Sequence, residues 1–136
     1  MGEYAFAGCS SLASLTFENS KLTSIEHAAF YNCSSLTSVV IPSSVTSIGV
    51  SAFGGCSSLV SVVIPTSVNS IESNSFGYYS NILIIYYKGT PEQWYSIANA
   101  DLFDQTVYFY SDTTPTDTTY TYWYFDYDGN KKIWLN

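Results

Sequence analysis

The sequence predicts a repeat solenoid built on a parallel β-sheet. A phenylalanine recurs at Phe6, Phe30, Phe53 and Phe76, which are 24, 23 and 23 residues apart. Three cysteines keep the same step, and residues 25–47 are repeated almost letter for letter in residues 48–70. A fixed period of this length is the signature of stacked supersecondary units, each of which needs its neighbours to complete a core.

Each unit contains a segment with apolar residues at its first, fourth and sixth positions. These segments are 12–17, 36–41, 59–64 and 82–87. Because side chains alternate along a strand, the fourth and sixth positions would point into the core: Leu15, Val39, Val62 and Ile85, with Phe17, Ile41, Ile64 and Tyr87. We therefore expect four short parallel strands. The last is apolar at every position, so it needs cover on both faces.

The remainder of each coil leads back to the core. Pro42 and Pro65 cannot donate to a strand ladder, and the hydroxyl residues after them favour turns. The following stretch, 48–53 in the third unit, is expected to form a single helical turn that buries Ala52 and Phe53. The three cysteines would be small core residues without a disulfide, since they share one repeat position on strands about 4.8 Å apart.

Residues 88–136 depart from the repeat and are expected to form a C-terminal cap in the same domain as the repeats. The repeats occupy residues 1–87 and make about four turns. Thr90 as N-cap, Pro91 at the first helical position and Gln93 three residues after the cap predict a helix start with a capping box. Trp94, Ile97 and Ala98 would share one face of that helix.

The rest of the cap is expected to contain one terminal strand and a hairpin. We expect residues 99–105 to be irregular and 106–110 to form a fifth strand that terminates the solenoid. Residues 111–121 have the Thr, Asp and Ser content of an exposed loop. Asp128-Gly129-Asn130 between aromatic and apolar runs is a strong hairpin signal, and its aromatics would pack on the last turns.

Composition excludes some functional classes. Charged residues make up 11% of the chain, and four Lys against eleven acidic residues give a formal net charge of -7 with no Arg. This balance repels phosphate, so we expect no nucleic-acid partner. No apolar run reaches 18 residues, and Met1-Gly2 aligns with Ile48-Gly49, so the chain begins in mid-repeat. We interpret it as part of a longer array, or as a chain whose leader has been removed.

The unit from Leu36 to Ser58 closely resembles the BspA-like leucine-rich repeats of bacterial surface proteins. The resemblance is strong over about residues 1–87, and the cap is similar to segments that close such arrays. It implies a leucine-rich repeat right-handed superhelix with a parallel β-sheet, short helical turns, and a C-terminal helix plus β-hairpin cap. It also implies a secreted or cell-surface, non-enzymatic role in adhesion, without cofactors.

The outer sheet face is the first candidate binding surface. It is uncharged, and its members alternate with the core positions: Ser14, Thr16, Ser38, Val40, Ser61 and Val63. Such a face could hold an extended polypeptide by apolar contact, and exposed apolar strips need an explanation. The alternative is that these β-branched residues serve only strand propensity.

The aromatic hairpin is the second candidate. It is similar to the aromatic hairpins of cell-wall-binding repeats, which implies glycan contact by Tyr122, Trp123, Tyr124 and Trp134. The alternative is a structural cap.

Neither a metal site nor a catalytic site is indicated. His27 is the only histidine, and no second ligand or activating partner accompanies it. The Asp126–Asn130 stretch lacks the glycine position and the later glutamate of a calcium loop. Neither Asp101 with Asp104 nor Asp126 with Asp128 establishes the carboxylate separation of a glycosidase.

The sequence therefore favours a non-catalytic module that binds a protein, plausibly a host or matrix protein. A carbohydrate or cell-wall-binding module and a structural spacer of a longer surface protein stay open as alternatives. The segment 12–17 has no preceding turn, so its edge is expected to pair with another chain.

Overall fold

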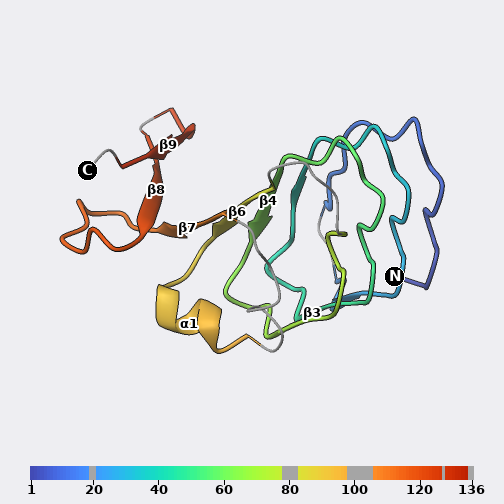
Figure 1. Ribbon diagram of the computed structural model, residues 1–136, viewed down its shortest axis with the longest axis horizontal. Helices are drawn as coiled ribbons and strands as arrows, with labels where there is room; N and C mark the ends of the chain where they lie inside the picture. The colour runs from blue at the N-terminus through green and yellow to red at the C-terminus, as the bar shows by residue number, and fades with distance from the viewer. Residues whose placement is uncertain (19–20, 78–82, 98–105, 127, 135–136) are drawn as a thin grey trace.

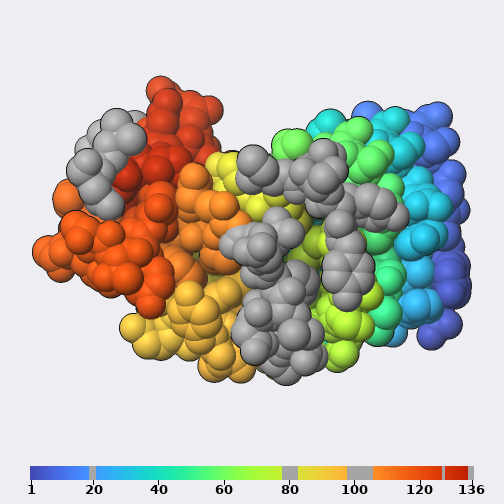
Figure 2. All heavy atoms as spheres, in the orientation of Figure 1, coloured from blue at the N-terminus to red at the C-terminus, as the bar shows by residue number. Residues whose placement is uncertain are grey.

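The computed structural model shows a solenoid whose coils stack along the long axis of the molecule (Figure 1). It describes residues 1–18, 21–77, 83–97, 106–126 and 128–134. The blue first coils and the orange to red C-terminal part lie at opposite ends, with the middle coils as successive bands between them (Figure 2). The predicted solenoid with a parallel sheet is confirmed.

Two sheets run along the stack. The larger has the order β2-β4-β6-β7-β8-β9 and is parallel from β2 to β8, and the smaller has the order β1-β3-β5. The strands are β1 Ser24–Ile25, β2 Ser38–Val40, β3 Ser47–Ile48, β4 Ser61–Ile64, β5 Ser70–Ile71, β6 Ile84–Tyr87, β7 Thr106–Tyr110, β8 Thr121–Phe125 and β9 Lys131–Ile133. Equivalent residues of successive units face each other, for example Ser38 with Ser61 and Ser47 with Ser70. The 23-residue period thus sets the register.

The core is a set of stacked columns of identical side chains. The rings of Phe6, Phe30, Phe53 and Phe76 lie nearly parallel, with centroids 5.3, 5.2 and 5.6 Å apart. The inward positions of β2, β4 and β6 are buried as predicted. Since each ring or aliphatic side chain is covered by its copy in the next coil, burial is shared between neighbouring units.

Hydrogen-bonded turns take the place of the single helical turn expected at residues 48–53. Ser51 and its equivalent Ala28 have positive φ angles of 52° and 51°, which do not belong to a right-handed helix. The N–H groups of these turns bond across to the adjacent coil. Phe30 N donates to Ala52 O at 2.8 Å, and Asn32 N donates to Gly54 O at 2.7 Å. These lateral bonds satisfy the backbone and leave no need for a helix.

The segment 12–17 does not form the first strand that its sequence predicts. Leu15 and Phe17 still turn inward, and the Phe17 ring meets Phe30 edge-on at 6.2 Å. Within the described residues this segment forms no ladder with β2, so β2 is the edge strand of the larger sheet. Apolar packing therefore holds this segment to the core without regular strand pairing.

The described cysteines are free thiols, as expected. Cys33 and Cys56 are buried, whereas Cys9 in the first coil is exposed rather than part of the core. The Cys33 thiol donates to Phe6 O at 3.3 Å and the Cys56 thiol to Phe30 O at 3.2 Å. Each thiol thus links its coil to the preceding one.

The helix α1, Pro91–Tyr95, carries the capping box. Gln93 N donates to Thr90 Oγ1 at 3.3 Å, and Thr90 N donates to Gln93 Oε1 at 3.0 Å. Trp94 and Ile97 are buried against the last coil. The predictions for Ile82, Ala98, residues 99–105 and Leu135 fall outside the described residues.

The hairpin is present, but it does more than cover the last turns. β8 and β9 pair antiparallel, and β8 itself pairs parallel with β7. Residues 106–110, expected to be the terminal strand, are therefore followed in the sheet by β8 and β9. β8 pairs with the free edge of β7 and so extends the sheet by an aromatic strand. The connection between β7 and β8 is an exposed loop without a helix.

In the described part of the chain, no helix has the length and apolar character needed to span a bilayer.

Candidate binding surface

The outer-face residues expected to contact a ligand are not equally available. Ser14, Thr16 and Ser38 are exposed, and Val40 is 56% exposed. Ser61 is half-buried, and Val63 is only 5% exposed. Val63 pairs in register with Tyr86, a much larger side chain than the valine at the equivalent position of β2. The accessible part of this face therefore lies over β2 and the coil before it.

Val60 belongs to this surface, and sequence reasoning missed it. It directly precedes β4 and is 52% exposed. Its N–H donates to Thr37 O at 2.9 Å, so the two residues lie side by side on adjacent coils. The sequence could have indicated it, because Thr37 and Val60 occupy the same position, between the leucine and the serine of their units. We call the exposed set the valine–hydroxyl strip: Ser14, Thr16, Thr37, Ser38, Val40 and Val60.

The strip offers apolar contact and hydroxyl hydrogen bonds on a rigid base. None of its members carries a charge. β2 is bonded to β4 in parallel register, and Ile41 N donates to Val63 O at 2.9 Å just beyond the ladder. A surface held this way loses little conformational entropy when it binds a partner.

Trp123 does not have the position that a glycan platform requires. Its side chain is fully buried, and its Nε1 donates to Tyr87 O at 3.1 Å. Trp134 is half-buried, its Nε1 donates to Ser111 O at 3.2 Å, and its ring lies 4.4 Å from that of Tyr124. Tyr122 packs against the core. These aromatics fasten β8 and β9 to the sheet, and Trp123 has no face left for a sugar ring.

Trp123 belongs instead to a group of aromatics on the outer face of β6, β7 and β8. We call Tyr86, Tyr108, Tyr110, Trp123 and Phe125 the outer aromatic cluster. Trp123 is its centre, with ring centroids 5.5 Å from Tyr86, 5.3 Å from Tyr110 and 5.1 Å from Phe125, all near edge-on. Edge-to-face pairs at these distances are favourable. Sequence reasoning missed the cluster because it depends on β8 joining β7.

The two lysines of β9 make different contacts, and Lys131 is the one that borders the outer aromatic cluster. Lys131 Nζ lies 3.9 Å from the centroid of the Tyr86 ring, a cation–π contact. Burial lowers the pKa of Lys131. Burial also raises the pKa of Tyr86, and the neighbouring Tyr108 raises it further. Lys132 Nζ lies 3.7 Å from Asp126 Oδ2.

Beside this cluster, Lys88, Tyr110 and Phe125 line an open hollow of about 220 Å³.

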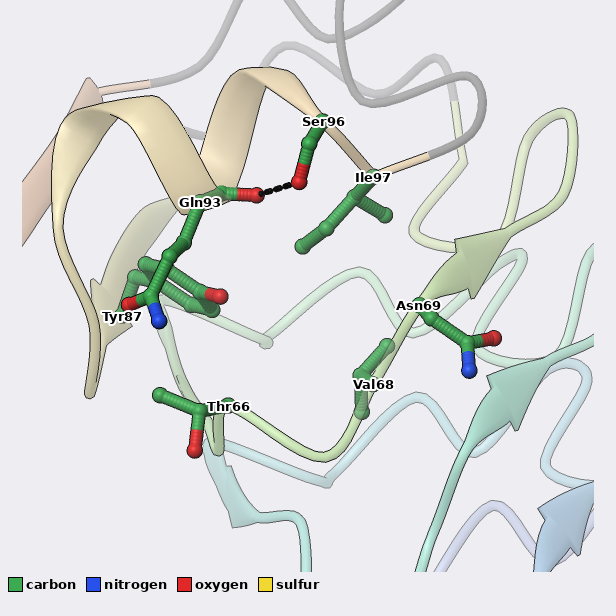
Figure 3. Close-up of a pocket in the computed structure, with 7 residues that line it drawn as sticks. All are labelled: Thr66, Val68, Asn69, Tyr87, Gln93, Ser96 and Ile97. Atoms are coloured by element: carbon green, nitrogen blue, oxygen red, sulfur yellow. Dashed lines mark hydrogen bonds between the residues drawn. The ribbon is translucent and has the colours of Figure 1, made fainter.

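A second hollow of about 200 Å³ lies between α1 and the coil after β4 (Figure 3). Its polar lining is uncharged and partly used in the fold. Gln93 is committed to the helix cap, and Ser96 Oγ donates to Gln93 O at 2.6 Å. The ring of Tyr87 on its wall is 1% exposed and rests on Trp94. Thr66 and Asn69 supply its remaining polar side chains.

The titratable residues serve structural contacts. The hydroxyl of Tyr4 and Nε2 of His27 share a hydrogen bond of 2.8 Å. Burial, with a smaller effect of Cys33, raises the pKa of the Cys56 thiol to about 12, so it stays protonated. Asp126 accepts from the N–H groups of Asp128 and Asn130 at 3.0 and 2.9 Å, which lowers its pKa and fixes the hairpin turn.

Within the described ranges, no group of three His, Cys, Asp or Glu could hold a metal ion. Asp101 and Asp104 lie outside those ranges.

Comparisons with known proteins agree with the repeat pattern. A family model described as BspA type leucine rich repeat region matches residues 1–107 in six copies. The chain is also similar to the crystal structure of a leucine rich cell surface protein from Faecalibacterium prausnitzii A2-165, with 36% sequence identity and a TM-score of 0.62. That match covers 71% of this chain but 25% of the other. No curated protein matches.

Proposed function

The chain belongs to the BspA type leucine-rich repeat family, and on this premise we propose that it is a non-catalytic, cell-surface module that binds protein. The similar solved structure is that of a leucine rich cell surface protein, which supports the surface assignment. Since this chain spans about a quarter of that protein's length, the proposal concerns this module and leaves the role of any larger protein open.

The observation that carries the proposal is the valine–hydroxyl strip. Val40 and Val60 leave more than half of their side-chain surface in water, at 56% and 52%, on two adjacent coils with no charge between them. Exposed apolar side chains grouped on a rigid sheet are typical of interaction surfaces. The partner we propose is a host or matrix protein, and the role is adhesion.

The test compares a double Val→Asp substitution in the strip with a single one elsewhere. Val40→Asp combined with Val60→Asp places two carboxylates in the strip, whereas Val50→Asp places one on a turn elsewhere in the coil, where Val50 is 36% exposed. The probe is an array of immobilised host extracellular and matrix proteins. We expect the double variant to lose at least about tenfold in affinity for the protein bound by the parent chain, and Val50→Asp to retain it.

Retention of binding by the double variant, with its fold intact by circular dichroism, would refute the strip as the contact surface. If the parent chain binds no protein on the array, the spacer role is favoured instead.

Self-association through the first coil stays a prediction. Tyr4 and Phe6 are 55% and 43% exposed at that end of the stack. Sedimentation of the chain over a range of concentrations measures it.

A further inference from the structure

The hollow between Lys88, Tyr110 and Phe125 brings a lysine together with two aromatic side chains. The chain has four lysines, no arginine and a net charge of -7. Lys88 and Lys131 lie beside the outer aromatic cluster, and Lys132, which pairs with Tyr124, lies on the other face of the hairpin. This end of an acidic molecule therefore combines positive charge with the exposed ring of Phe125.

The three lysines differ in whether their charge is already used. Lys131 lies over the Tyr86 ring, and Lys132 pairs with Asp126 in the one ion pair among the described residues. Lys88 is exposed, and its backbone N–H donates to Ile64 O at 2.9 Å, which fixes its position at the end of β6. Of these three lysines, Lys88 is therefore the one that lines the hollow with no acidic side chain or ring against its ammonium group in the described part of the chain.

The aromatic wall of the hollow is rigid. Tyr110 and Phe125 both pack on Trp123, which the hydrogen bond to Tyr87 O holds in place. Phe125 nevertheless leaves 47% of its side chain exposed. An apolar group that settles on Phe125 and Tyr110 would bury this surface without the cost of ordering the rings.

We propose that this hollow docks an acidic residue followed by an apolar one in an extended segment of a protein partner. The carboxylate would pair with Lys88, and the apolar side chain would cover Phe125 and Tyr110. The inference rests on the proposed protein-binding function and names the partner's chemistry. Tyrosine side chains with a neighbouring cation are frequent at protein interfaces, where charge complementarity selects the partner.

The same geometry argues against a sugar as the occupant. A sugar ring carries hydroxyl groups around its edge, and each loses bonds to water on docking. The lining offers one ammonium group and one phenol hydroxyl to replace them. A peptide that presents one carboxylate and one apolar side chain leaves fewer polar groups without a partner.

The test uses four synthetic decapeptides in a Gly/Ser frame whose central pair is Asp-Phe, Lys-Phe, Asp-Ser or Lys-Ser. Binding is followed by ¹⁵N–¹H chemical-shift changes of the whole chain. We expect the Asp-Phe peptide to bind about tenfold more tightly than the other three, with shifts at residues 88, 110 and 125. Lys88→Glu and Phe125→Ser should each remove the preference, and Phe125→Leu should keep most of it.

Lys21→Glu is the matched control for charge, because Lys21 is exposed and far from the hollow in sequence. Equal binding of all four peptides, or an Asp-Phe preference that survives Lys88→Glu, would overturn the proposal. Tighter binding of a glucuronate-containing oligosaccharide at the same residues would also overturn it, in favour of a glycan.

The peptide experiment and the protein-array experiment can fail independently. Binding of the Val40→Asp and Val60→Asp double variant to the array tests the proposed function, whether or not the peptides bind to the hollow.

Discussion

Removal of one ring from the middle of the phenylalanine column should cost far more than removal of the terminal ring. Phe53 is fully buried and stacks on Phe30 and on Phe76 at 5.2 and 5.6 Å. Truncation of a buried Phe to Ala costs about 3–5 kcal/mol. Phe6 is 43% exposed and stacks on Phe30 alone. For Phe6→Ala we expect about 1–2 kcal/mol, since the transfer and cavity terms are both reduced.

The assay is urea unfolding followed by far-ultraviolet circular dichroism, with Phe53→Leu as an intermediate variant. Leucine keeps most of the apolar volume but loses both ring contacts, each worth about 0.5–1.5 kcal/mol. The expected order of destabilisation is Phe53→Ala, then Phe53→Leu, then Phe6→Ala. Because a domain of this size has a total stability of about 5–15 kcal/mol, Phe53→Ala is expected to remove a large fraction of it.

If Phe6→Ala costs as much as Phe53→Ala, the coils do not share burial in the way that the stacking implies. Native-state hydrogen exchange adds a second readout. Phe53→Ala should expose amides of the coils on both sides of it, while Phe6→Ala should affect only the first two.

Three further predictions concern the backbone, the cap and the thiols. Gly49→Ala would put a Cβ 2.8 Å from the backbone of Glu26 and His27, so we expect a loss of about 1–3 kcal/mol in urea, whereas Gly2→Ala, with open space around it, should cost nothing measurable. Trp123→Phe leaves Tyr87 O without its buried donor and should lower the free energy of unfolding by about 1–3 kcal/mol in the same assay; an unchanged midpoint contradicts the assigned bond. A thiol reagent should label Cys9 alone in the folded chain and all three cysteines in denaturant. Since the pKa of Cys56 rises from 9.0 to about 12 on folding, the unfolded chain loses that proton first. The stability that Cys56 contributes is thus complete below pH 9 and is lost between about pH 9 and 12, and Cys56→Ala should show a smaller alkaline decline.

The columns of the core could be predicted because they follow from spacing alone. A residue type that recurs every 23 positions must meet its copy in the next coil, as Phe30 meets Phe53. The conformation between the columns did not follow, because it depends on neighbours distant in sequence. Ala28 adopts a positive φ although it is not glycine, and its N–H bonds to Val50 O in the adjacent coil. No local signal specifies that bond, and a helical turn was the local alternative.

In the hairpin, too, the local sequence predicts the turn, whereas contacts with distant residues decide which side chains are buried. Its turn is encoded in five consecutive residues, where the Asp126 carboxylate accepts from two backbone N–H groups. The exposure of its aromatics is not encoded there. Trp123 alternates with Tyr122 and Tyr124 and looks like one side of a free hairpin. Once β8 pairs with β7, however, Tyr86 and Tyr110 enclose its ring. The choice of sheet partner therefore decided which aromatics could reach a ligand.

The two exposed regions of the outer face are close enough to serve one partner. The register places Val40, Val63, Tyr86 and Tyr108 in one row across β2, β4, β6 and β7, and the outer aromatic cluster continues onto β8. Four strand spacings of about 4.8 Å separate β2 from β8 by about 19 Å. Phe125 lies four residues further along β8 than Thr121, which continues the row, so the path from Val40 is about 23 Å. An extended segment rises about 3.3 Å per residue, so about seven residues would reach from Val40 to the hollow at Phe125. A protein segment that crosses the strands, with apolar residues over Val40 and an acidic one at Lys88, would use both.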